Sequence, residues 1–103
     1  MSTETSQTSS SYKLPKEKCL IEAAKQSIVE DKPIMMDYWT DSLEKKVIIG
    51  VKGDDEKLLV KTEDEYTSPI LNIYKVGTEY LIITQNSIYV VSASIDVKRV
   101  SPN

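Results

Sequence analysis

The spacing of the apolar residues changes once along this chain, at Pro33, and this change constrains the fold more than any other feature. In residues 15–30 the apolar side chains recur at helical spacing and form one stripe: Leu20, Ile21, Ala24, Ile28 and Val29. After Pro33, apolar and polar residues alternate with the period of two that is typical of β-strands. No helical spacing separates the predicted strands, which argues against a parallel sheet.

The predicted helix, residues 15–30, has a defined start and end. Pro15 suits the first turn, where its missing N–H costs little. The residue before a proline avoids the helical region, so we expect the helix to end near Asp31, ahead of Pro33. A helix with one apolar stripe needs an apolar surface to cover it. We therefore expect the stripe to lie on a sheet.

Residues 33–97 predict an antiparallel meander of five or six strands. Strands are expected at residues 34–39, 45–51, 57–61, 70–76, 79–84 and 87–91, with an extended continuation to Val97. Gly77-Thr78 has the composition of a type II′ hairpin turn, and the small residues 92–94 allow a bend. The predicted fold class is mainly β with one N-terminal helix (α+β), arranged as a twisted sheet or a small SH3-like barrel.

The predicted strands 79–84 and 87–91 are apolar on both faces. In the first of them, Tyr80 and Ile82 point one way while Leu81 and Ile83 point the other way. Burial on both faces predicts a central position under the helix or closure toward a barrel.

Length and composition predict one domain, residues 12–100, behind a disordered tail. Residues 1–11 are rich in Ser and Thr and have no apolar anchor after Met1, so we expect them to be disordered. This segment lacks the charged and apolar regions of a secretory signal. The single cysteine, Cys19, cannot form an intrachain disulfide. These observations predict an intracellular location.

The charge distribution disfavours a nucleic-acid partner. The net charge is −3, and residues 31–66 carry ten acidic and six basic side chains. A dense basic stripe, which a phosphate backbone requires, is missing from the sequence. The longest uncharged run, residues 80–95, is interrupted by polar residues and predicts strands rather than a membrane span.

The residue types predict no enzyme, no cofactor and no metal site. The chain has no histidine, so Cys19 has no imidazole partner that could activate it as a nucleophile. The acidic clusters 54–56 and 63–65 lack the ligand spacing of a calcium loop. The three glycines are scattered rather than gathered in a phosphate-binding loop.

Four aromatic residues are the candidate partner-binding residues: Tyr38, Trp39, Tyr66 and Tyr74. On a small barrel they would form an aromatic cage for a modified lysine, with a carboxylate from Asp37, Asp64 or Glu65. The alternative is that they pack in the core or on the faces of strands. Tyr66 also follows an acidic triplet in a long loop, and tyrosine is enriched at interaction hot spots.

Three segments together resemble small uncharacterised proteins of large nucleocytoplasmic DNA viruses: residues 37–46, 63–70 and 86–91. The resemblance spans residues 33–95 and implies a role as a minor virion component, located in the host cytoplasm or the virion. It carries no catalytic or binding residues.

Two functional hypotheses remain open. The first is a non-enzymatic protein-interaction or structural protein, which binds a protein partner or itself. The alternative is a small recognition module that reads a peptide or a modified side chain through its Tyr and Trp residues.

Overall fold

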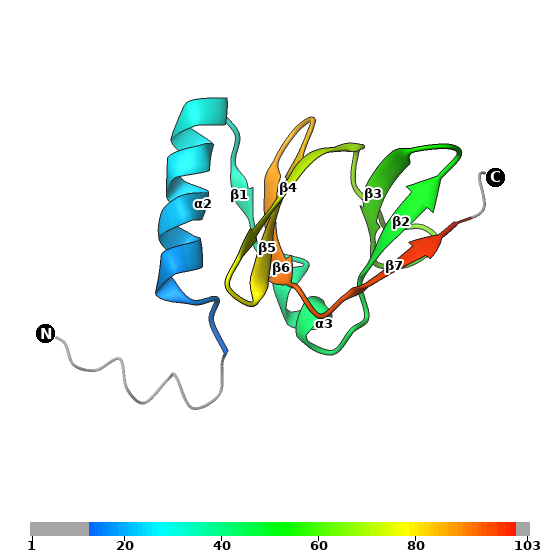
Figure 1. Ribbon diagram of the computed structural model, residues 1–103, viewed down its shortest axis with the longest axis horizontal. Helices are drawn as coiled ribbons and strands as arrows, with labels where there is room; N and C mark the ends of the chain where they lie inside the picture. The colour runs from blue at the N-terminus through cyan, green and yellow to red at the C-terminus, as the bar shows by residue number, and fades with distance from the viewer. Residues whose placement is uncertain (1–12, 101–103) are drawn as a thin grey trace, which may run out of the picture.

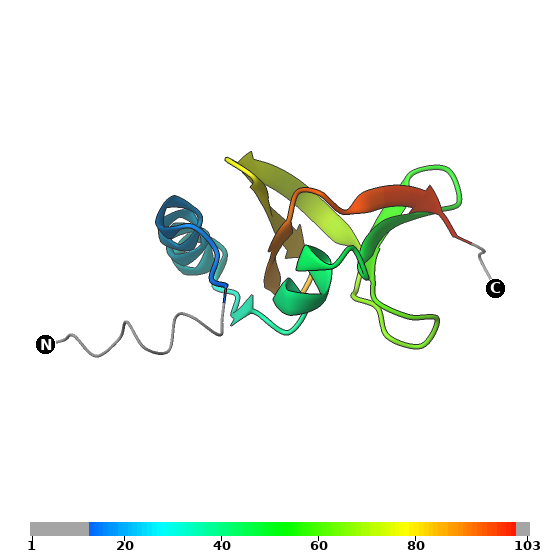
Figure 2. The ribbon, with the colours of Figure 1, turned by 90° about the horizontal axis from the view of Figure 1, so that it is seen from below.

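The computed structural model describes residues 13–100, which form three layers (Figure 1). Helix α2 (Glu17–Glu30) covers one face of a four-stranded sheet, and a three-stranded sheet packs against the other face. A view from below shows the same order of layers, with α2 at one end and the three-stranded sheet at the other (Figure 2). The predicted disordered tail, residues 1–11, lies outside the described residues.

Within residues 13–100 the structure has seven strands and, besides α2, one short helix. The helix is α3 (Trp39–Leu43), and the strands are β1 (Ile34–Met35), β2 (Ile48–Lys52), β3 (Glu56–Val60), β4 (Ile70–Val76), β5 (Glu79–Thr84), β6 (Ile88–Ser92) and β7 (Asp96–Arg99). We call the four-stranded sheet, with the order β1-β6-β5-β4, the inner sheet. The outer sheet has the order β3-β2-β7.

Helix α2 confirms the prediction for residues 15–30 to within two residues at its start. Asp31 ends the helix in the left-handed conformation, with a φ of 57°, and its N–H donates to the carbonyl of Ser27. Lys32 N–H also donates to Ser27, and Pro33 follows. The chain therefore leaves the helix where the sequence predicted.

The antiparallel meander β4-β5-β6 is also confirmed, and the bounds of β4 and β5 agree with the predicted residues 70–76 and 79–84. Gly77 has a φ of +63°, and Thr78 does not share this left-handed conformation, as a type II′ turn requires. The hairpin register is regular except for one shift between Ile70 and Asn72.

The prediction of one five- or six-stranded meander, or a closed SH3-like barrel, is wrong. The seven described strands form two separate sheets, and these sheets do not close into a barrel. Neither sheet is purely antiparallel, as a meander would be, because β1 pairs parallel with β6 and β2 pairs parallel with β7. All four side chains of β7 are exposed, so its pairing leaves no alternating burial pattern in the sequence.

The predicted strand 34–39 is wrong beyond its first two residues. Only β1 is extended, and α3 begins at Trp39. Tyr38 and Trp39 are both buried, although neighbours on a strand would face opposite sides of a sheet. Ser42 joins this turn of helix to the inner sheet, since its hydroxyl accepts from Ser92 N–H at 2.9 Å.

Two apolar clusters hold the layers together. The cluster between the sheets contains Tyr38, Val47, Ile49, Leu59, Ile82, Val91 and Ile95. The cluster between α2 and the inner sheet contains Cys19, Ala23, Trp39, Leu81 and Val90. Alternate residues of β5 and β6 therefore enter different clusters, which confirms the predicted burial of both faces.

The core position of Ile82 predicts the effect of placing a charge there. Ile82 is fully buried between the sheets, so Ile82→Asp would bury a carboxylate without a partner. We expect the free energy of unfolding, measured by urea denaturation, to fall by about 3 to 5 kcal/mol. Val97→Asp is the control, because Val97 is exposed on β7, and it should cost less than about 1 kcal/mol. Equal losses in the two variants would contradict this core.

Candidate functional site

Helix α2 turns its large apolar side chains away from the inner sheet. Cys19 and Ala23, which are both small, contact the sheet and are fully buried. Ile28 lies about half a turn around the helix from Cys19, at 3.6 residues per turn. The prediction that the apolar stripe lies on the sheet is therefore wrong. The sheet accepts small side chains, because its own Leu81, Val90 and the indole of Trp39 fill the space beneath the helix.

We call the exposed apolar residues on and before α2 the outer face. They are Leu14 (69% exposed), Leu20 (37%), Ile21 (49%), Ile28 (81%) and Val29 (74%). Single exposed apolar residues are common on proteins, but a contiguous group marks an interaction surface.

Contacts near both ends of α2 fix its rotation on the sheet. At the start, both carboxylate oxygens of Glu79 accept from Lys16 N–H, at 3.1 and 3.2 Å. The indole N–H of Trp39 donates to the carbonyl of Lys13 at 2.7 Å. At the end, the ammonium of Lys32 donates to the carbonyl of Thr84 on β5 at 2.8 Å. The outer face is therefore held toward solvent.

The thiol of Cys19 lies inside this interface. Burial raises its pKa to about 11, and the nearby Glu79 carboxylate adds to the rise. The thiolate is the reactive form of cysteine. Cys19 therefore packs as a small apolar residue rather than presenting a nucleophile.

The structure places a lysine of the chain itself against the ring of Tyr38. Lys61 Nζ lies 4.6 Å from the ring centroid and donates to the carbonyl of Asp37 at 3.0 Å. The carboxylates of Asp41 and Glu65 lie 3.7 and 3.5 Å from the same nitrogen. This is the chemistry predicted for an aromatic cage, and an internal cation occupies it.

The four predicted aromatic residues do not come together. Tyr38 and Trp39 are buried in different clusters. Tyr66 is 59% exposed and pairs with Val60 in an isolated bridge beside the outer sheet. Tyr74 is 43% exposed on β4, at the edge of the inner sheet. Tyr66 and Tyr74 are therefore the two that remain accessible to a partner.

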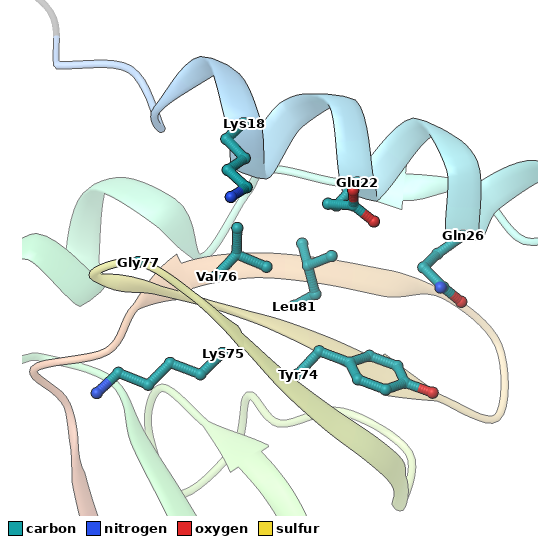
Figure 3. Close-up of a pocket in the computed structure, with 8 residues that line it drawn as sticks. All are labelled: Lys18, Glu22, Gln26, Tyr74, Lys75, Val76, Gly77 and Leu81. Atoms are coloured by element: carbon teal, nitrogen blue, oxygen red, sulfur yellow. The ribbon is translucent and has the colours of Figure 1, made fainter.

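A trough runs between α2 and β4 (Figure 3). Its volume is about 360 Å³. One wall is a row of side chains four residues apart on the helix, Lys18, Glu22 and Gln26. The side chains of Val76 and Leu81 rise from the sheet toward this row, and Tyr74 lies at the far end (Figure 3). The trough exists because α2 covers β5 and β6 but leaves β4 uncovered.

A second hollow, of about 470 Å³, lies on the other side of the β4–β5 turn. Lys13, Lys16 and Trp39 line it, and it shares Lys75 and Gly77 with the trough. We call Lys13, Lys16, Lys18 and Lys75 the lysine cluster. All four side chains are exposed, and none forms a salt bridge within residues 13–100. Sequence reasoning missed the cluster, because Lys75 is 57 residues beyond Lys18 and only the fold brings them together.

Residues 13–100 contain no group of three or more His, Cys, Asp or Glu side chains arranged to hold a metal ion. No helix in the same range is long and apolar enough to cross a membrane.

Comparisons of this chain with protein-family models, with curated proteins and with solved structures found no match. Function is therefore inferred from the geometry, and the viral resemblance stays a prediction.

The environment of Tyr38 predicts a loss of stability at alkaline pH. Burial raises its pKa to about 12, and the Glu65 carboxylate adds to the rise. A tyrosine in an unfolded chain ionises at about pH 10. The stability that the neutral phenol contributes is therefore complete below about pH 10 and is lost as the pH rises toward 12.

We expect urea denaturation of the wild type to show a steeper fall in stability between about pH 10 and pH 12 than denaturation of Tyr38→Phe. Tyr66→Phe is the control substitution, since the ring of Tyr66 is exposed. Identical slopes for the wild type and Tyr38→Phe would contradict the assignment.

Proposed function

We propose that this protein is a non-enzymatic protein-interaction or structural protein that binds a protein partner, or another copy, through the outer face of α2. The observation that carries the proposal is the rotation of α2 about its own axis. This rotation places large apolar residues in solvent and small ones in the core. Ile28 and Val29 are 81% and 74% exposed on a helix tethered near both ends.

The energetic argument concerns these same side chains. Covering one fully exposed Ile or Val contributes roughly 1.5 to 3 kcal/mol. Rotating α2 to bury them inside the molecule would break the contacts of Glu79 and Lys32 and would expose Cys19 and Ala23. A partner that covers the outer face from outside gains this energy without that cost. The fully buried core of an interface is more apolar than the rest of a protein surface, so these side chains suit that position.

The alternative hypothesis, a module that reads a modified side chain, has less support from the geometry. The four aromatic residues that it requires are dispersed, and the ammonium group of Lys61 already lies over the ring of Tyr38. We include a role as a minor virion component in this proposal, because such a role is compatible with a structural interaction protein.

Removing apolar surface from the outer face tests this function. We expect the double variant Ile21→Ser/Ile28→Ser to keep the wild-type thermal midpoint, because both side chains already face solvent. It should lose association, measured as mass by light scattering and as proteins recovered by affinity capture from the source extract. Val97→Ser is the matched control, since Val97 is 59% exposed on the opposite end of the molecule.

Two results would contradict the proposal. If the double variant is destabilised as strongly as Ile82→Asp, the outer face belongs to the core of the chain. If the double variant, the control and the wild type have the same mass and recover the same proteins, another surface makes the contacts.

A further inference from the structure

The lysine cluster is a local excess of positive charge on an acidic chain. The net charge is −3, yet the two hollows beside the β4–β5 turn are lined by four lysines and two glutamates: Lys13, Lys16, Lys18, Lys75, Glu22 and Glu79. In Figure 3 the Lys18 side chain reaches from the helix toward Val76, and the Lys75 side chain extends from β4 on the side away from α2. Four cations without acidic partners in the described residues create a positive potential that attracts a segment of opposite charge.

The trough beside this cluster fits a short segment that also carries an aromatic or apolar residue. Val76, which is half-buried, supplies apolar contact, and Tyr74 stands exposed at the far end. Gln26 supplies a polar group along the helix wall, and the carboxylate of Glu22 is paired there with Lys25 at 3.4 Å. An aromatic residue next to a run of carboxylates therefore matches the trough and the lysine cluster together.

Within residues 13–100, one exposed segment has this composition, the loop Glu63–Tyr66. The side chains of Glu63 and Asp64 form no salt bridge within the described residues, whereas Lys61 turns inward against the ring of Tyr38. Tyr66 is 59% exposed directly beside the acidic residues. We call this loop the acidic loop.

The acidic loop cannot reach the trough of its own molecule. It bridges to β3 in the outer sheet through Tyr66 and Val60, whereas the trough lies beside α2 on the other side of the inner sheet. Figures 1 and 2 show these two regions at opposite ends of the molecule. The acidic loop can therefore fill this trough only in a second copy.

We propose that the acidic loop of one copy docks in the trough and on the lysine cluster of another copy. Glu63 and Asp64 face the lysines, and Tyr66 contacts the apolar lining beside Tyr74. The contact joins two different surfaces, so it is head-to-tail and leaves a free trough and a free loop at the ends of every chain of copies. It uses residues outside the outer face and is independent of the function proposed above.

This contact is expected to be weak and sensitive to salt, because exposed ion pairs contribute little individually and are screened by added ions. Sedimentation velocity at about 50 mM NaCl should show mass increasing with protein concentration, and about 500 mM NaCl should suppress the increase.

Charge reversal in two complementary variants tests the pairing. The trough variant is Lys18→Glu/Lys75→Glu, and the loop variant is Glu63→Lys/Asp64→Lys. Each alone brings like charges together, so its self-association should weaken about tenfold, as expected for the loss of a few exposed ion pairs. Mixing the two variants should restore association, because every loop then meets a trough of opposite charge. Circular dichroism and thermal midpoints verify that each variant is folded.

A matched control separates this contact from a general effect of net charge. Lys57→Glu/Lys98→Glu changes the net charge by the same amount as the trough variant, at two exposed lysines of the outer sheet. It should associate as the wild type does.

Several results would overturn the inference. These are a monomeric wild type at every concentration, trough and loop variants that associate like the wild type, or a mixture that stays as weakly associated as its components. If only Ile21→Ser/Ile28→Ser reduces association, the outer face holds the copies together, and the proposed function stands without this contact. Binding of a labelled oligonucleotide that the trough variant abolishes, with no self-association, would assign the lysine cluster to a nucleic acid instead.

Discussion

Burial of both faces of β5 and β6 is the constraint on which the rest of this structure depends. Leu81 and Val90 face α2, whereas Ile82 and Val91 face the outer sheet. A sheet with two apolar faces needs two covers, and a chain of this length supplies one helix and one small second sheet. The three-layer order follows from this requirement, and so does the need for α3, which directs Tyr38 and Trp39 into different clusters.

The way in which α2 packs on the inner sheet determines which surfaces remain for partners. Glu79 fixes the start of the helix, and the small side chains of Cys19 and Ala23 allow a close approach to the sheet. The large apolar residues are consequently left on the outside. Because the helix lies over β5 and β6, it also leaves β4 open, and the trough forms at that boundary. Both proposed contact surfaces therefore result from the way in which α2 packs on the inner sheet.

The sequence predicted the elements that rest on local patterns. The stripe and the two prolines predicted α2, and alternation with Gly77 predicted the β4–β5 hairpin. The sequence did not predict features that depend on contacts between residues far apart in the chain. The apolar stripe of α2 has the correct spacing for burial, but spacing does not reveal that the sheet prefers Cys19 and Ala23. Likewise, the four residues of β7 pair with β2 although none of them is buried. Of the four aromatic residues predicted to bind a partner, the structure leaves Tyr66 and Tyr74 exposed. The lysine cluster was not predicted.

The parallel pairing of β2 with β7 also bears on the order in which the chain folds. The meander β4-β5-β6 forms from contacts close in sequence. The pairing of β2 with β7 instead joins residues far apart in the chain, such as Ile48 and Asp96. Pairing across such a separation is slow, because the entropy of closing the loop is lost before the contacts form. We therefore expect an intermediate with a formed meander and an open β2 edge. Such an edge is a template for pairing with other chains, so the time before β7 docks is the period in which aggregation competes with folding.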